Sequence, residues 1–361
     1  MKNRQITIID VAKSAGVSIA TVSNVLNRRN VPLSHETIRK VEDAAQALGY
    51  RRNVMAASLS RKKTFELGLI LPSFGGYFAD FAHVMQDAVH RCGYHLSVYS
   101  SYNNPELEKR HLETLLQRRV DGLFCHGLAM PPELARKFVG EGTPMVLFNA
   151  WNWPEDVTLG AVNLDFAGGA AEAVEHLAAQ GCQALVYISK QRARATDHQR
   201  QLGFLKGIGG LAAGACKHHE IIPSVTLGEE GLYQTLVEHV QKYGSVGLLA
   251  FDDYDALIML SRLRERGVKV PEQIKIVGIN DQMFVSYCWP PITSLAIDLE
   301  NQVFHAVHLL LSHLGEAAAL EAIPLQGHKA VRPEEGPAHE IHIPMKLMRR
   351  MSTDASPCIG G

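Results

Sequence analysis

The sequence has 361 residues, which is too long for one typical domain and suggests two or three. Hydrophobic residues make up 46% of it, enough for sizeable cores, and no run of about 18 apolar residues could form a membrane-spanning helix. The net charge is only −1, but residues 1–63 contain 12 Lys and Arg against 4 Asp and Glu. A basic head on an acidic body is expected when only the head contacts phosphate groups.

The six cysteines are widely spaced and form no CxxC motif. Residues 1–20 are polar and charged, so we expect no signal peptide and a cytoplasmic protein with reduced thiols. The histidine pairs His218 with His219 and His339 with His342 lack an assigned third ligand, and we interpret them as surface histidines. We therefore expect no metal site and no cofactor.

Residues 7–27 predict two short helices that meet at Gly16, because apolar residues recur at i, i+3 and i+4 on both sides of it. Gly16 can adopt the positive φ of a tight turn. Thr7 is the expected cap of the first helix, with Asp10 as its partner, and Ser18 is the expected cap of the second. This is a helix-turn-helix pattern, and a recognition helix of that kind would present three side chains to base edges: Ile19, Ala20 and Asn24.

A third amphipathic helix is expected over residues 34–49, and a basic but partly apolar segment follows at residues 51–64. Linkers are seldom both basic and apolar. We interpret the segment as a hinge that folds on DNA and inserts Leu59 into the minor groove, as apolar wedges do. The alternative is a solvated tether.

From Glu66 onward, apolar runs alternate with helical segments, which indicates parallel sheets with helices on both faces. Strands are expected at residues 67–71, 95–99, 122–125, 145–149, 160–163, 185–189, 247–251, 275–279 and 340–347. Helices are expected at residues 78–92, 105–118, 166–180 and 256–266. So many strands fit two sheets better than one, and a ligand cleft should lie between two lobes, beyond the carboxyl ends of the strands.

Taken together, the head, the hinge and the two-lobed body resemble the lactose-repressor/galactose-repressor family of bacterial transcription regulators. The most specific segments are ITIIDVAKSAGVSIATVSNVLN and LGYRRNVMAASL. Shorter matches follow in the family's order: VDGLF, GAVNLDFAGG, ERGVKVP, VGIND, PPITSL and MRRMST. The resemblance implies a small all-α helix-turn-helix head and an α/β, periplasmic-binding-protein-like body with two doubly wound parallel sheets.

The resemblance also implies which residues contact DNA. Ile19, Ala20 and Asn24 stand at base-reading positions, where Asn24 can pair with adenine and the other two offer apolar contacts. The remaining implied contacts are with phosphates or lie in the hinge: Thr7, Ser18, Thr21, Ser23, Asn27, Asn53 and Leu59. Without an arginine in the reading set, the half-site is expected to rely on A·T contacts at these positions.

The resemblance also implies which residues contact the effector. They follow strands of the body or lie shortly before Gly203. Arg200 is the best supported of these assignments. At the end of the VGIND segment, Asn280 stands where the family usually has an acidic residue, and Asp281 follows it. The full implied set is Tyr77, Phe78, Trp151, Arg194, Thr196, Arg200, Asp253 and Asn280. Aromatic platforms with Arg, Asp and Asn suit a sugar or a sugar derivative, and two arginines also suit an acidic or phosphorylated ligand. Purines and nucleosides are alternatives.

The expected domains are a head at residues 1–50, a hinge at 51–65, an N-terminal lobe at 66–162 and about 291–323, and a C-terminal lobe at 163–290 and about 340–353. Residues 354–361 are expected to be disordered. The expected partners are a pseudo-palindromic operator in double-stranded DNA, a small effector and a second copy of the chain, with no membrane. The tail after Arg350 lacks an apolar heptad repeat, which favours a homodimer over a tetramer.

Two other classes of function were weighed. A cytoplasmic sugar-binding protein without a regulatory role would share the body but has no use for a basic helix-turn-helix. An enzyme is disfavoured because the glycine-rich GIGGLAAG follows a helical segment instead of a strand, which is the wrong context for nucleotide binding. The sequence leaves open whether the effector induces or corepresses.

Overall fold

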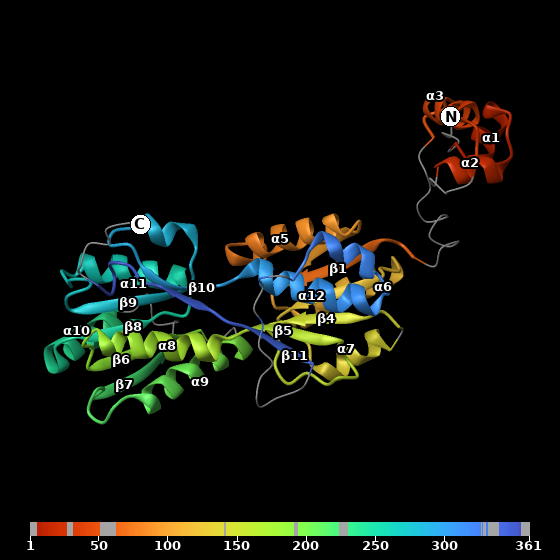
Figure 1. Cartoon of the computed structure of the whole chain (residues 1–361). Helices are drawn as coiled ribbons and strands as arrows, with labels where there is room; N and C mark the ends of the chain where they lie inside the picture. Colours follow the sequence, from red (N-terminus) through yellow and green to blue (C-terminus); the bar gives the residue numbers. More distant parts are fainter. Residues whose placement is uncertain are drawn as a thin grey trace. The chain divides into compact units, whose positions relative to one another are not determined.

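The structure is a computed structural model, and it describes residues 6–26, 32–50, 63–140, 142–190, 194–223, 230–325, 327, 330 and 339–354. The chain divides into two compact units, Met1–Thr64 and Phe65–Gly361, which are coloured along the sequence in Figure 1. Among the described residues, none of the helices combines the length and apolar character needed to cross a lipid bilayer.

In its described residues, the first unit has three helices around a small core. They are α1 (Ile8–Ala15), α2 (Ile19–Leu26) and α3 (His35–Ala47). The core consists of short side chains: Val11, Ala12, Val22, Val25, Val41, Ala44 and Ala45. So little buried apolar area makes the head a marginal domain by itself.

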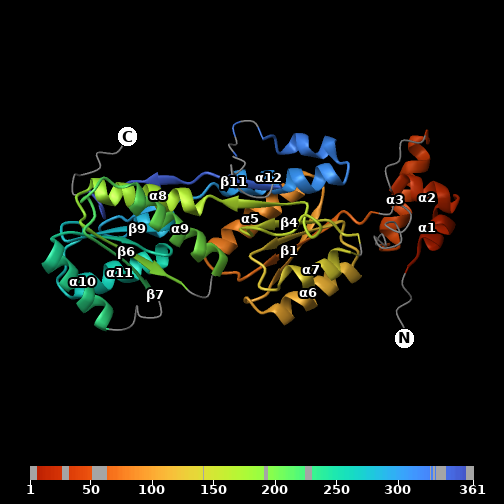
Figure 2. The same cartoon turned by 90° about the horizontal axis from the view of Figure 1, so that it is seen from below.

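The first lobe of the body is a six-stranded parallel sheet. In spatial order, its strands are β11 (Glu340–Ile343), β5 (Gly160–Leu164), β4 (Met145–Phe148), β3 (Gly122–His126), β1 (Glu66–Leu71) and β2 (His95–Ser100). One face packs against α5 (Tyr77–Arg91) and α12 (Leu299–His313). The other packs against α6 (Pro105–Gln117) and α7 (Pro132–Val139), as Figure 2 shows. Both faces are covered, which explains why these strands are continuous apolar runs.

The second lobe repeats this arrangement. Its sheet has the order β12 (Lys346–Met348), β10 (Thr293–Ala296), β9 (Ile274–Asn280), β8 (Val246–Leu249), β6 (Ala184–Ser189) and β7 (His218–Pro223). One face carries α8 (Phe166–Ala179) and α9 (Arg194–Gly210), and the other carries α10 (Glu230–Tyr243) and α11 (Asp253–Glu265). Among its described residues, the body also has two 3₁₀ helices, η2 (Met283–Ser286) and η3 (Ala317–Ala322). The predicted fold class is confirmed.

The chain crosses between the lobes three times, and here the structure corrects the expected boundaries. The strand β10 pairs with β9 and so belongs to the second sheet, although residues from 291 were assigned to the first lobe. The predicted strand 340–347 is two strands: β11 pairs with β5 in the first sheet, and β12 pairs antiparallel with β10 in the second. Pro344 separates them, because proline has no N–H to continue a ladder. The boundary expected after residue 162 falls inside β5, and the sequence reading missed β7 and β10.

Close contact between α8 and α9 depends on glycine. A Cβ atom added at Gly203 would lie 2.2 Å from the backbone oxygen of Ala167 and 2.7 Å from its Cα. Backbone atoms cannot move aside as a flexible side chain can, so only glycine allows this approach. The packing fixes the position of α9, which carries Arg200.

Candidate functional site

The helix-turn-helix of the head has the expected joints. The backbone N–H of Thr7 donates to Oδ2 of Asp10 at 2.9 Å, and its hydroxyl donates to the same oxygen at 2.7 Å. Gly16 ends α1 with φ of 66°, in the left-handed region. The backbone N–H of Thr21 donates to Oγ of Ser18 at 3.0 Å, which caps α2. Thr7, Ser18 and Thr21 thus hold the helix ends.

The first turns of α2 carry the residues predicted to read bases. Ile19 and Ala20 are exposed, and Asn24 is half-buried on the same helix. Val22 and Val25 point into the head core between them, which leaves Ser23 half-buried at the edge.

Several predicted contacts lie outside the described residues. They are Asn27, Asn53 and Leu59, together with the hinge at residues 51–62. Arg194 begins α9, but its side chain is also outside the described part. The expected disordered tail lies outside as well, apart from Asp354.

In the body, the guanidinium of Arg200 is a charged group that is buried. Its side chain is 4% exposed, and its carbon Cζ lies 4.2 Å from the ring centre of Phe166 and 3.9 Å from that of Phe251. Both contacts are cation–π geometry. Its Nε and Nη1 atoms are buried and have no hydrogen-bond partner among the described residues. A buried donor without an acceptor costs about 1–3 kcal/mol, so such a group calls for a ligand that accepts.

Acidic residues lie close to Arg200. The ammonium of Lys190 lies 3.2 Å from Oδ2 of Asp252 and 3.5 Å from Oδ1 of Asp255, and 5.2 Å from the ring centre of Phe251. Burial, followed by the neighbouring Asp252, raises the pKa of Asp255 from 3.8 to about 6. Arg200 has electrostatic interactions with Asp252 and Asp255, so cations and carboxylates alternate here.

The start of α9 is held by Asp197, which the sequence reading missed. Its carboxylate accepts from the hydroxyls of Tyr187 and Ser189, both at 2.7 Å, and from Nε2 of Gln201 at 2.7 Å. Thr196, one residue earlier, is half-buried. Asp197 therefore positions the helical turn that carries Arg200.

The first lobe contributes a buried polar network at the ends of β3 and β4. The ring nitrogen Nε2 of His126 lies 3.1 Å from the hydroxyl of Tyr77 and 3.1 Å from Nδ2 of Asn149. Gln302 of α12 donates from Nε2 to Oδ1 of Asn149 at 3.2 Å. Burial lowers the pKa of His126 to about 3, so the imidazole is neutral at ordinary pH. Since the amide nitrogen of Asn149 can only donate, Nε2 of His126 is the acceptor and Nδ1 carries the proton.

The two lobes meet at this network. Tyr77 has an electrostatic interaction with Arg200 of the second lobe, and the ring of Phe78 lies 5.1 Å from that of His126. A Cβ atom at Gly76 would lie 3.1 Å from the ring of Tyr254, on α11. Trp151, after β4, lies 6.2 Å from the ring of Phe166. Predicted residues from both lobes are thus brought together around Arg200.

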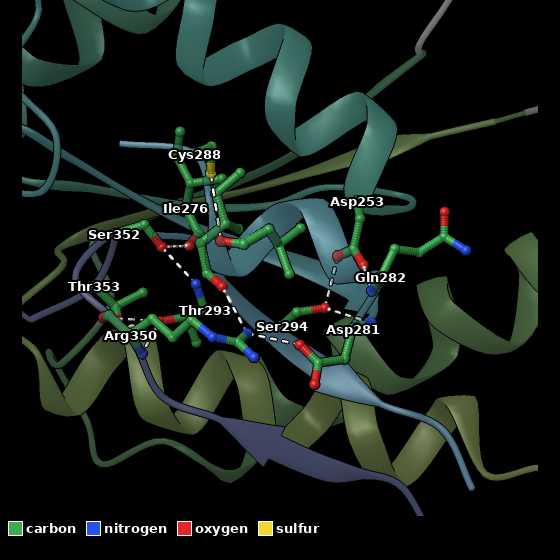
Figure 3. Close-up of polar contacts among 12 residues, drawn as sticks. Asp253, Ile276, Asp281, Gln282, Cys288, Thr293, Ser294, Arg350, Ser352 and Thr353 are labelled. Carbon is green, nitrogen blue, oxygen red and sulfur yellow. Dashed lines mark hydrogen bonds and ion pairs between the residues drawn. The ribbon is translucent and has the colours of Figure 1, made fainter. Parts of the chain in front are cut away.

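The structure places Asp253 elsewhere, which revises its predicted role. It is fully buried, and its oxygens accept from Oγ of Ser294 at 2.6 Å and from the backbone N–H of Gln282 at 2.7 Å (Figure 3). Burial raises its pKa from 3.8 to about 7. The side chain ties α11 to β10 inside the second lobe, and the carboxylate beside Lys190 is that of Asp252. The reason is local: Asp252 is the N-cap of α11, so the next residue turns inward.

Other residues of the site were not singled out from the sequence. Phe251 and Asp252 come two and three residues after β8, Lys190 follows β6, and Phe166 comes two residues after β5. The ends of parallel strands were the signal that could have found them, because ligands bind at that edge of such sheets. Asn280, which was predicted, ends β9 with φ of 108° and a half-buried side chain.

Family models match both units of the chain. A model described as "Bacterial regulatory proteins, lacI family" matches residues 7–53, which span the helix-turn-helix. A model described as "Periplasmic binding protein-like domain" matches residues 174–353 of the body. This chain belongs to the lacI family of bacterial regulatory proteins. As a lacI-family member, it is a DNA-binding transcription regulator with an effector-binding, periplasmic-binding-protein-like body, and the family is not enzymatic.

Relatives match nearly the whole of this lacI-family chain. Catabolite control protein A of Staphylococcus aureus (strain Mu50 / ATCC 700699) is 26% identical over 316 residues, which covers 86% of this chain and 93% of the relative. The protein of the same name from Staphylococcus epidermidis is 28% identical over 317 residues, with the same two coverages.

Solved structures share the fold. The lac repressor dimer bound to operator and the anti-inducer ONPF has a TM-score of 0.76 and 21% identity, and the match covers 97% of this chain and 99% of that one. The transcriptional regulator CelR in complex with cellobiose has a TM-score of 0.61 and 21% identity, with coverages of 96% and 99%.

Proposed function

We propose that this regulator is a repressor that binds a pseudo-palindromic operator as a homodimer. A small molecule bound beside Arg200 raises or lowers its affinity for the operator. The observation that carries the effector site is the buried guanidinium of Arg200, stacked between two aromatic rings, with two donors that lack an acceptor among the described residues. A lone buried charge of this kind costs stability unless a ligand completes it.

The surroundings of Arg200 favour a sugar or a sugar derivative. Trp151 is a half-buried aromatic beside Phe166, and Asp252 with Lys190 offers an acceptor and a donor for hydroxyl groups. A structurally similar regulator was solved with cellobiose. The guanidinium would donate to two hydroxyl oxygens or to one carboxylate, so a sugar acid fits as well as a neutral sugar.

For DNA, we propose that Ile19, Ala20 and Asn24 read bases and that Thr7, Ser18, Thr21 and Ser23 contact phosphates from the exposed side of α2 and its caps. Asn27 is proposed to face a phosphate as well, and Asn53 and Leu59 to extend the contact along the hinge. We expect Leu59→Gly to weaken operator binding and to leave sugar binding by the body unchanged. Operator affinity equal to that of the wild type would refute the hinge assignment.

We propose a homodimer formed through the second lobe. Large apolar side chains are exposed there on and after η2 and on α11: Met283, Tyr287, Trp289 and Ile258. Apolar groups of this size gathered on one lobe are typical of a surface that pairs. Two heads held by such a dimer could occupy successive major grooves, about 34–36 Å apart or a multiple of that.

Three experiments test the proposal. A thermal-shift screen against neutral sugars, sugar acids, phosphosugars and purines identifies the effector, and selection from random DNA yields the operator. Fluorescence anisotropy of that operator is then titrated with and without the effector. We expect a sugar or sugar acid to change operator affinity, and the operator to change effector affinity by the same factor, because the coupling is reciprocal. Binding of a sugar with no change in operator affinity would refute regulation.

A further inference from the structure

A cluster of three possible metal ligands lies outside the regulatory site, at the edge of the second sheet. His218 and Glu220 are on β7, the last strand of that sheet, and His239 is on α10. The cluster lies on the sheet face covered by α10, whereas Arg200 on α9 belongs to the opposite face. It therefore has no part in the function proposed above.

The local structure explains why these side chains meet. Residues 218, 220 and 222 point to one face of a strand because side chains alternate, and Ile222 is buried against α10. On α10, Leu232, Leu236 and His239 follow one another at spacings of four and three, which places them on one helix face. The histidine thus extends the buried stripe of the helix toward the two residues of the strand.

The distances suit a shared ligand. Oε2 of Glu220 lies 3.0 Å from Nε2 of His239 and 3.6 Å from Nε2 of His218. The three ligand atoms all lie within 4.8 Å of one another. Around a tetrahedral ion with bonds of about 2.0–2.1 Å, ligand atoms are about 3.3–3.4 Å apart. Shifts of the order of 1 Å or less would therefore bring all three atoms into coordination.

An ordinary ion pair explains only part of this arrangement. The pair of His239 and Glu220 at 3.0 Å is satisfied by itself. His218 is not, because its Nε2 is buried and has no hydrogen-bond partner among the described residues. Its ring is stacked on Tyr243 at 5.3 Å with an angle of 4° between the planes, which fixes the direction in which Nε2 points. A metal ion would complete that nitrogen.

We propose that His218, Glu220 and His239 form a binding site for a divalent transition-metal ion, with zinc as the favoured occupant. Two imidazoles and one carboxylate suit zinc, whereas calcium and magnesium prefer oxygen ligands alone. The ion would link the edge strand β7 to the next element, α10, and a water molecule would fill the fourth position. Glu220 is 41% exposed at its side chain, so an ion can enter from solvent.

Zinc calorimetry on the full-length, untagged and chelator-treated chain tests the site. We expect one tight site per chain, and at least about a hundredfold weaker binding in His218→Ala, His239→Ala and Glu220→Gln, since even second-shell changes cost 10- to 100-fold. The matched control is His219→Ala, whose side chain is exposed on the other face of β7 and which should bind as the wild type does. The control matters because the chain has 17 histidines.

Cobalt substitution supplies an independent readout. The visible d–d bands of Co²⁺ should show tetrahedral coordination in the wild type and in His219→Ala, and these bands should be lost in Glu220→Gln. Circular dichroism establishes that each variant is folded, and Glu220→Gln preserves the size of the side chain. Absence of a tight zinc site in the wild type, or wild-type zinc affinity in folded Glu220→Gln, would overturn the proposal.

Discussion

Replacement of Arg200 by methionine separates its role in ligand binding from its role in stability. Methionine has a similar volume and an unbranched stem, so Arg200→Met should leave no large cavity between Phe166 and Phe251. It removes the two buried nitrogen donors that have no partner among the described residues. The change therefore affects the proposed effector contacts far more than the packing.

The magnitudes can be worked out from these contacts. A hydrogen bond to a charged group is worth about 1.5–3 kcal/mol, so loss of two of them should weaken effector binding by at least about 100-fold. In the ligand-free protein, loss of two desolvated cation–π contacts costs about 2 kcal/mol each. Relief of two unsatisfied donors returns about 1–3 kcal/mol each. The free energy of unfolding should consequently change by less than about 2 kcal/mol.

The assay is calorimetric titration with the sugar that most stabilises the wild type, together with urea unfolding of the ligand-free chain. Lys206→Met is the matched control, because it makes a similar exchange at an exposed position of the same helix. Operator affinity without effector should be unchanged in both variants. Effector affinity in Arg200→Met within about threefold of the wild-type value would refute the assignment of Arg200.

Other changes probe the helix contact, the DNA surface and a buried acid. Gly203→Ala should destabilise the body by about 1–3 kcal/mol or more in urea unfolding, because its Cβ would overlap the α8 backbone. The control Gly209→Ala, at a position with open space around it, should leave the stability unchanged, and equal stabilities of the two variants would contradict the close contact. In electrophoretic mobility shifts, Asn24→Ala should weaken binding by about 1–3 kcal/mol through the loss of preference at one base pair, whereas Thr21→Ala should weaken binding to every DNA sequence. An Asn24 variant with unchanged base preference would count against base reading. The pKa of Asp253 is raised from 3.8 to about 7, so between pH 3.8 and pH 7 the folded chain retains a proton that the unfolded chain loses. The free energy of unfolding should therefore fall as the pH rises from 5 to 7.5, by at most about 1.4 kcal/mol per pH unit. Asp253→Asn should flatten that slope, and an unaltered slope would assign it to another group.

The helix-turn-helix could be predicted residue by residue because its determinants are local. The caps at Thr7 and Ser18 and the turn at Gly16 involve residues within a few positions of one another. The continuous apolar runs of the body likewise predicted most of its described strands, because both faces of each sheet are covered. The helical spacing of apolar residues predicted α5, α6, α8 and α11. Arg200 was identified through a family pattern, which also depends only on sequence.

What only the tertiary structure decided involves residues that are distant in the chain. No local signal showed that β10 and β11 belong to different sheets, because pairing partners are chosen by the fold. The one-residue difference between Asp252 and Asp253 sends one carboxylate toward Lys190 and the other into the lobe, through the geometry of a helix start. His218 was interpreted as a surface histidine and His239 was not singled out, and β7 and α10 bring both to one carboxylate. Sequence patterns report which face a residue occupies, and the fold alone decides which distant residue shares it.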